Sequence, residues 1–333
     1  MKEYLIRRLL FLIPLLFVLA FVNFALVSAM GNPFASMLQM PGMTRASIQS
    51  LLELWHWDEP LPIRFLYWIK SIFSPSLRGG FSTSIIGTTA MDLIIQRLPI
   101  TIALSGISML IAIIISIPLG VYSALHQYSK TDYGVTFLSF FGMSMPVFWF
   151  GLMLMYLFSY KIGIFPTGGV HSLFININND LVEFSQAPWI RRFLDYTWHL
   201  VLPVTILVLF QVGRWLRYAR SSILEVKNMD YVRTARAKGL SERKLIYKHI
   251  IRNGILPLVT FFGLSFPALV GGATITETIF AIPGLGRLTY DATMSQDIFV
   301  AMGAILFLSI FTILGSFIAD ILYAKLDPRI RYK

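Results

Sequence analysis

The residues that could do chemistry are few and widely spaced. The chain has no cysteine and five histidines, and no histidine stands three or four positions from another. A zinc motif on a helix needs those offsets, so the histidines form none. The phosphate-binding pattern GxxxxGK[ST] is also missing. The sequence therefore predicts no metal centre, no cofactor site and no ATPase site in this chain.

Other glycine and serine motifs are incomplete. The stretch at Gly284 reads GLGR and lacks the third glycine of a dinucleotide-binding loop. The segments GMSMP and GLSFP each miss the second glycine of a nucleophile elbow. The apolar runs carry no acidic residue, which a proton relay generally needs. We expect a protein that is not an enzyme and that takes its energy from another chain.

One basic segment stands out, residues 214–252, which we call the arm. It holds eleven Lys and Arg against three acids, a net charge of +8 out of +11 for the whole chain. Asp230 can cap a helix that runs to Lys238, Gly239 can take the left-handed position after it, and Ser241 can cap a second helix. These signals predict a helix, a tight turn and a helix that project into water.

Composition indicates the elements that must hold this arm. Of 333 residues, 56% are hydrophobic and only 14% are charged, which favours a membrane protein over a soluble one. Six apolar runs are long enough to cross about 30 Å of hydrocarbon. They lie at 9–30, 98–125, 133–160, 196–213, 253–276 and 298–319. The sequence predicts an all-α membrane protein with six transmembrane helices.

These runs divide the chain into three parts. Residues 1–30 are expected to be an N-terminal segment with a retained first span, because its apolar run is too long for a signal peptide. Residues 31–97 form an extracytoplasmic insertion, with short amphipathic helices whose tryptophans settle at the membrane interface. The alternative is that this insertion only packs. Residues 98–333 form a core of five spans that carries the arm.

The distribution of Lys and Arg predicts the orientation. With the N-terminus inside, nineteen lie on the inner side and nine on the outer side. The positive-inside rule then places both termini and the arm in the cytoplasm. The fifth run contains Gly263, Pro267, Gly271 and Gly272, which would suit a kinked, moving helix that lines the pathway. Ordinary packing explains them equally well.

Several stretches carry a resemblance to a known family. The run DYVRTARAKGLSERKLIYKHIIRNGILP resembles the cytoplasmic loop of ATP-binding-cassette (ABC) importer permeases, in the form of the dipeptide, oligopeptide and nickel branch. The segments YLIRRLLFLIPLL and ETIFAIPGLGRL match the same branch, as do LPIRFLYWIK, RLPITIAL and IPLGVYSAL. The resemblance covers essentially the whole chain, and the sequence is similar to the B-type permease subunit.

The resemblance implies a type I importer permease with a cytoplasmic coupling helix–turn–helix. For this implied role, we name residues 214–252 the coupling arm. The residues expected to dock on an ATPase are Arg233, Thr234, Ala235, Arg236, Ala237, Lys238, Gly239 and Leu240. Those expected to contact a partner permease at the outer mouth are Glu277, Pro283, Gly284 and Gly286. The implied partners are a second permease in a heterodimer, two ATPase subunits that bind ATP and Mg, an extracytoplasmic substrate-binding protein and membrane lipid, but no nucleic acid.

The family implies a place in a bacterial or archaeal cytoplasmic membrane and half of a pathway for di- and oligopeptides. Oligosaccharides, nickel complexes and glutathione remain open as substrates. Two readings from other classes also stand as alternatives. One is a purely structural membrane subunit or a channel. The other is a membrane-tethered DNA-binding protein whose arm would contact phosphates through Arg233, Arg236, Lys238, Arg243 and Lys244. ATPase subunits that copurify with the chain would favour the importer, and salt-sensitive DNA retention by the arm would favour DNA binding.

Overall fold

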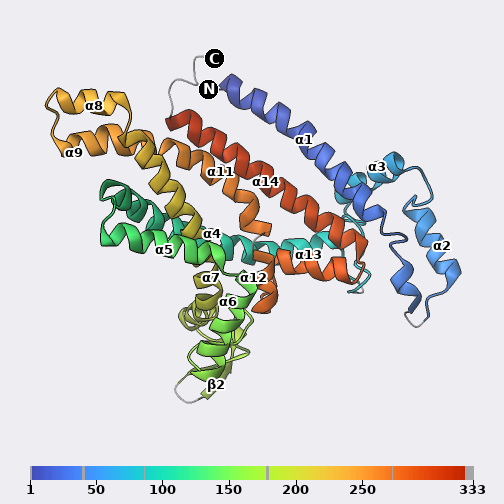
Figure 1. Ribbon diagram of the computed structural model, residues 1–333. Coiled ribbons are helices and arrows are strands. Elements are labelled where there is room, and N and C mark those ends of the chain that lie inside the picture. The colour runs from blue at the N-terminus through green and yellow to red at the C-terminus, as the bar shows by residue number, and fades with distance from the viewer. Residues whose placement is uncertain (1, 40–41, 86, 178–179, 272, 327–333) are drawn as a thin grey trace. The chain divides into compact units, whose positions relative to one another are not determined.

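The computed structural model describes residues 2–39, 42–85, 87–177, 180–271 and 273–326, and most of these residues are helical (Figure 1). The α-helices are α1 (Lys2–Ser28), α2 (Arg45–Leu54), α3 (Leu61–Ile72), α4 (Ala90–Leu125), α5 (Lys130–Ser144), α6 (Val147–Leu154), α7 (Trp189–Lys227), α8 (Asp230–Ala237), α9 (Glu242–Lys244), α10 (Arg252–Gly254), α11 (Leu256–Gly271), α12 (Ala273–Ile279), α13 (Leu285–Met294) and α14 (Ile298–Leu326). Short 3₁₀ segments lie at Ala35–Gln39 and Phe184–Gln186, and π-helical segments η2 (Met155–Lys161) and η4 (Leu245–Ile251) continue α6 and α9.

The helical content confirms the predicted fold class, and one short hairpin adds to it. Strands β1 (Phe174–Ile177) and β2 (Asp180–Glu183) form an antiparallel hairpin in the insertion between α6 and α7. Phe174 pairs with Glu183 and Ile177 with Asp180. The sequence FINI alternates apolar and polar residues only partly, but its β-branched isoleucines suit a strand. Two strands of four residues each are too short to produce a clear alternating pattern among the polar residues of this insertion.

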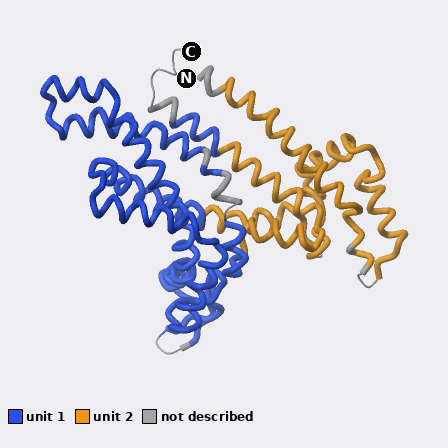
Figure 2. Tube along the Cα trace, viewed as in Figure 1, with its two compact units in different colours: residues 1, 103–282, 315–333 blue, residues 2–102, 283–314 orange. Residues whose placement is uncertain are grey.

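The chain divides into two compact units, shown in blue and orange in Figure 2. Unit 1 comprises residues 103–282 and 315–333 with residue 1, and unit 2 comprises residues 2–102 and 283–314. Helices α4 and α14 each contribute residues to both units. The coupling arm belongs wholly to unit 1, and the insertion at 31–97 belongs wholly to unit 2.

Among the described residues, four helices are long and apolar enough to cross a membrane, namely α1, α4, α7 and α14. A fifth candidate is the pair formed by α5 and α6 with η2, if the two bent parts count as one span. The remaining expected span, 253–276, falls on α10, α11 and α12, and α11 alone has 16 residues. At 1.5 Å per residue this is about 24 Å, short of the hydrocarbon thickness. Six spans therefore stay a prediction.

The expected span 133–160 is not straight. Its two halves meet at an angle of 100° between Ser144 and Val147. Pro146 has no backbone N–H, and it restricts the residue before it to extended conformations. Met145 accordingly has φ −77° and ψ 135°, which ends α5. The proline in GMSMP breaks an apolar run that hydropathy alone reads as one helix.

Unit 1 is held together by close packing of α5 on α7. A Cβ on Gly142 would lie 2.8 Å from the Leu209 carbonyl oxygen, and one on Gly213 would lie 2.8 Å from the Ser139 carbonyl oxygen. Small residues let membrane helices approach until their backbones touch. A buried cluster with Trp215 at its centre continues this contact to α4 and α11.

Unit 2 has an aromatic core. Trp55 packs on Phe299 with ring centroids 4.5 Å apart, and Trp68 packs on Phe24 at 5.4 Å. Trp55, Trp57 and Trp68 are all buried, although the sequence predicted tryptophans at a membrane interface. Large aromatic rings bury 150–250 Å² each and so contribute strongly to a core. For these three tryptophans, the alternative that the insertion only packs therefore agrees better with the structure than a place at the membrane interface.

Candidate functional site

The coupling arm comprises the last part of α7 and then returns through α8, α9 and η4. Helix α8 faces inward with Val232, which is fully buried against Leu245 and Ile250 of η4. Ile223 of α7 and Ala124 of α4 complete this cluster. Burying a side chain of this size contributes roughly 1.5–3 kcal/mol. Helix α8 and η4 are therefore fixed on the end of α7 by an apolar core, and this part of the arm is not a free loop.

The turn between α8 and α9 has the geometry that the sequence predicts. Gly239 has φ +77°, the left-handed conformation that favours glycine. The Gly239 amide donates to the Arg236 carbonyl at 3.0 Å, and the Leu240 amide donates to the Ala235 carbonyl at 3.3 Å. These two bonds are those of a Schellman motif, which satisfies carbonyls at the end of a helix.

The caps at the two helix starts differ from the prediction. Helix α8 is capped by Met229, and Asp230 is its first residue. An acid there still favours the helix, because the N-terminus carries partial positive charge. Ser241 does precede α9, but its side chain makes no capping hydrogen bond. The bounds of the helices were therefore predicted well, and the side-chain interactions at their starts were not.

An ion pair closes the turn. The Arg236 Nε donates to the Glu242 Oε1 at 2.6 Å, and the Nη2 donates to Oε2 at 3.4 Å. This hydrogen bond lowers the pKa of Glu242 from its ordinary value of 4.5 and raises that of Arg236. Both side chains are exposed, so the pair directs the turn more than it adds stability.

Most of the predicted docking residues lie on the surface. Ala235 and Leu240 are half-buried, and Ala235 packs against the core of the arm itself. The exposed ones are Arg233, Thr234, Arg236, Ala237, Lys238 and Gly239. The small exposed residues at the tip are therefore Ala237 and Gly239, and nothing within 4 Å would meet a Cβ on Gly239. Backbone and cations are therefore exposed together at the tip.

An ion pair that the sequence analysis missed lies at the base of the arm. Asp132 of α5 accepts hydrogen bonds from Arg220 of α7, at 2.7 Å from Nε and 3.0 Å from Nη2. It also accepts from the Ser123 hydroxyl at 2.5 Å and the Tyr128 amide at 2.9 Å. Asp132 is almost fully buried, so its charge needs these partners. The pair joins α4, α5 and α7.

In the sequence, Asp132 stands at the start of a helix, and this local role is enough to explain an acid there. Ser129 caps α5, and its Oγ accepts from the Asp132 amide at 3.2 Å. Such a serine followed three residues later by an acid is typical of a helix start. The partner Arg220 is 88 residues away, so sequence spacing could not indicate the ion pair.

Three of the four predicted pathway residues lie on α11. A Cβ on Gly263 would lie 2.0 Å from the Ala319 Cβ of α14. In the same way, a Cβ on Gly315 would lie 2.1 Å from the Phe266 Cβ. Helix α11 includes Pro267 and ends at Gly271, whereas Gly272 lies outside the described residues. Packing explains Gly263, and a moving helix stays a prediction.

The ETIFAIPGLGRL segment is largely internal. Glu277, Gly284 and Gly286 are buried, and Pro283 is half-buried. In unit 1, the Phe280 carbonyl accepts from the Gly169 amide at 2.8 Å. In unit 2, the Leu285 amide donates to the Thr101 Oγ1 at 2.7 Å. A contact with a partner permease stays a prediction, and the exposed positions nearby are Ile275, Thr278, Ala281 and Tyr290.

Unit 2 holds a second buried carboxylate that the sequence analysis missed. The Asp297 Oδ2 accepts from the Ser82 hydroxyl at 2.6 Å and from the Ser84 amide at 3.1 Å. Asp297 directly precedes α14, and its carbonyl accepts from the Ala301 amide at 2.9 Å. The acid therefore fastens the end of the insertion to the start of the last helix.

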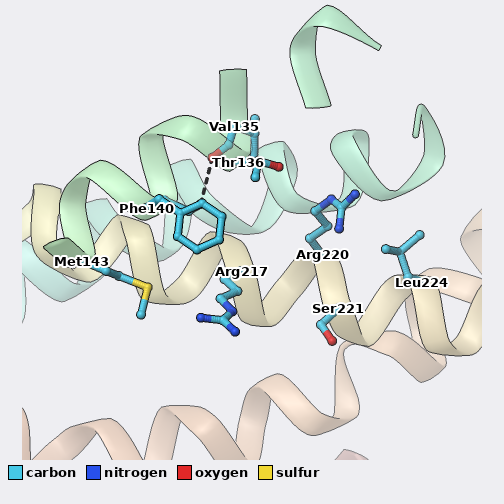
Figure 3. Close-up of a pocket in the computed structure, with 9 residues that line it drawn as sticks. Val135, Thr136, Phe140, Met143, Arg217, Arg220, Ser221 and Leu224 are labelled. Carbon is cyan, nitrogen blue, oxygen red and sulfur yellow. Dashed lines mark hydrogen bonds between the residues drawn. The ribbon is translucent and has the colours of Figure 1, made fainter. Parts of the chain in front are cut away.

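A cavity of about 260 Å³ opens between α5 and α7 beside the Asp132–Arg220 pair (Figure 3). Arg217, Arg220, Ser221 and Leu224 line it from α7. Val135, Thr136, Ser139, Phe140 and Met143 line it from α5. Its lining is mixed. Two guanidinium groups and several hydroxyls are polar, and the remaining side chains are apolar.

Comparison with known proteins agrees with this architecture. Residues 116–332 match the family described as the binding-protein-dependent transport system inner membrane component. The chain is 40% identical over 335 residues to the oligopeptide transport system permease protein AppB of Bacillus subtilis, and 34% identical over 341 residues to the dipeptide transport system permease protein DppB of Escherichia coli K12. Both matches cover 100% of this chain and of the relative.

A solved structure supports the fold. One chain of the inward-facing MetNI methionine ABC transporter superposes with a TM-score of 0.53 at 15% sequence identity. The match covers 71% of this chain and 97% of that chain. At this identity the likeness concerns the fold alone.

Proposed function

The chain belongs to the family of binding-protein-dependent transport system inner membrane components, and we propose that it forms half of the pathway of an ATP-driven peptide importer. The observation that carries the proposal is its end-to-end likeness to oligopeptide and dipeptide permeases. The family partners with ATPase subunits and with a substrate-binding protein. A second, homologous permease would complete the pathway as a heterodimer.

The coupling arm supplies the mechanical link in this proposal. Its exposed tip would dock on an ATPase, and α8 transmits force to α7 through the buried Val232. Because Arg220 ties α7 to Asp132 of α5, a displacement of the arm moves both helices. ATP hydrolysis in the partners would in this way alternate access to the pathway. The chain itself would neither bind nor hydrolyse ATP.

The proposed orientation places both termini in the cytoplasm. Because the sequence has no cysteine, single cysteines can report it. Ser76 in the insertion and Ser241 in the arm are both exposed, which makes them a matched pair. In sealed cells, a membrane-impermeant maleimide should label Ser76→Cys and spare Ser241→Cys. Labelling of Ser241→Cys would refute the orientation.

Transport itself can be tested with the full complex in proteoliposomes. We expect uptake of a radiolabelled peptide that requires ATP, the binding protein and this chain together. Unlabelled peptides should compete, whereas an oligosaccharide, a nickel complex and glutathione should not. ATP-dependent uptake of one of these without peptide uptake would assign the importer to that substrate. Copurification of the chain with DNA but without ATPases would reject the proposal altogether.

A further inference from the structure

The cavity between α5 and α7 contains one arginine that the ion pair does not use. Arg220 is held by Asp132, so the two charges compensate each other. Arg217 lies one turn earlier on α7 and has no hydrogen-bond or ion-pair partner among the described residues, and no acidic residue lines the cavity (Figure 3). The cavity therefore carries one uncompensated positive charge, on the same face of α7 as the Ser221 hydroxyl.

The depth of Arg217 indicates what kind of anion could reach it. The apolar run of α7 ends at Gly213, and Arg217 follows four residues later, about 6 Å along the helix. The headgroup layer adds about 5–8 Å beyond the hydrocarbon on each side of a bilayer. Arg217 therefore lies at the level of lipid phosphates. This estimate holds whichever side of the membrane the arm occupies.

The apolar part of the cavity lies deeper. Helices α5 and α7 run antiparallel, because Asp132 meets Arg220 while Ser139 meets Gly213. Phe140 and Met143 therefore lie toward the hydrocarbon, on the inner side of the arginines. A cavity that changes from cationic to apolar along the membrane normal matches a lipid, whose phosphate and acyl chains change in the same direction.

We propose that this cavity binds the phosphate of an anionic phospholipid. The Arg217 guanidinium contacts the phosphate in a bidentate manner, as arginine does with such oxygens, and the Ser221 hydroxyl donates to the same group. Phe140 and Met143 cover the first carbons of an acyl chain. Because only one positive charge is uncompensated, a lipid with net negative charge binds better than a zwitterionic one. The proposal requires a membrane and does not depend on peptide transport.

The test uses the full-length chain in nanodiscs of phosphatidylcholine, with and without phosphatidylglycerol. Lipid retained by the protein is counted by mass spectrometry, and thermal unfolding is followed in parallel. We expect Arg217→Gln to weaken phosphatidylglycerol binding about tenfold, as expected for one charge-assisted bidentate contact. Arg217→Lys should retain part of the binding. Arg214→Gln removes an exposed arginine of α7 that does not line the cavity, and it should bind as the wild type does.

Further arms separate the possible sources of the anion. Wild type and Arg217→Gln should unfold at the same temperature in pure phosphatidylcholine, which excludes a folding defect. Inorganic phosphate should not displace the lipid, and displacement at equal concentration would show a site for a soluble anion and overturn the proposal. Unchanged phosphatidylglycerol retention in Arg217→Gln would also overturn it. If that variant instead raises only the KM for peptide uptake, the cavity belongs to the transport pathway.

Discussion

Gly239 at the tip of the coupling arm and Gly263 in α11 are required for opposite reasons. Gly239 has φ +77° and open space around it, so glycine is there for the direction of the backbone. Gly263 has no unusual backbone, but a Cβ would lie 2.0 Å from the Ala319 Cβ. Glycine at the tip therefore shapes an exposed turn, as the proposed docking on a partner requires. The crossing of α11 and α14 is built to bring two helices of the same chain into contact.

The largest effect on stability is expected where helices of the same chain pack together, at the Asp132–Arg220 pair. Arg220→Gln leaves the buried Asp132 carboxylate without its cation, and breaking such a pair typically costs 3–5 kcal/mol. Because Arg220 is partly exposed, we expect about 3 kcal/mol, measured as a lower unfolding temperature in detergent. Arg214→Gln, on the same helix, should leave that temperature unchanged. Equal stability of both variants would contradict the role of the pair.

Gly263→Ala should be the next largest change. The new methyl group forces α11 and α14 apart, and overpacking of this kind costs about 1–3 kcal/mol. The double variant Gly263→Ala with Ala319→Gly should recover part of the loss, because it removes the opposing Cβ. Gly106 of α4 is a matched control, since a Cβ there meets nothing within 4 Å. If Gly106→Ala destabilises as much as Gly263→Ala, steric contact is not the cause.

Gly239→Val should have a smaller effect on stability and a larger one on coupling. A β-branched residue in the left-handed conformation costs about 1–2 kcal/mol, which should redirect α9. Gly239→Asn tolerates that conformation and should retain the turn. The readout is the rate of hydrogen exchange at the Leu240 amide together with ATP-dependent uptake. Wild-type exchange and uptake in Gly239→Val would contradict the claim that the turn requires glycine for its backbone conformation.

The smallest effect concerns the ion pair across the turn. Because Arg236 lowers the pKa of Glu242, the stabilisation is complete above the ordinary value of 4.5 and is lost as the pH falls through the lowered pKa. Hydrogen exchange at the turn, expressed relative to Glu242→Gln, should therefore be slower in the wild type at neutral pH and equal in strong acid. Glu225→Gln removes an exposed carboxylate of α7 and serves as the control. A difference that persists in strong acid would contradict the assignment.

The parts of the fold that follow local rules could be predicted from the sequence. The bounds of the arm and the left-handed Gly239 depend on signals within a few residues. The Asp132–Arg220 pair, the burial of Trp55 and the crossing at Gly263 depend on residues far apart in the chain, which no local pattern specifies. Hydropathy also read 133–160 as one span, because it weighs the apolar character of GMSMP and not the missing N–H of Pro146.

The central claim is that the arm couples an ATPase to the membrane helices through the shape of its tip. The most direct measurement is ATP hydrolysis and peptide uptake in the same proteoliposomes for Gly239→Val, Ala237→Glu and Lys248→Gln. Ala237 is exposed at the tip, whereas Lys248 is an exposed cation of η4 away from the tip. We predict that the first two variants assemble normally but lose coupled uptake, and that Lys248→Gln retains it. Normal coupling in both tip variants with loss in Lys248→Gln would contradict the account and assign coupling to charge alone.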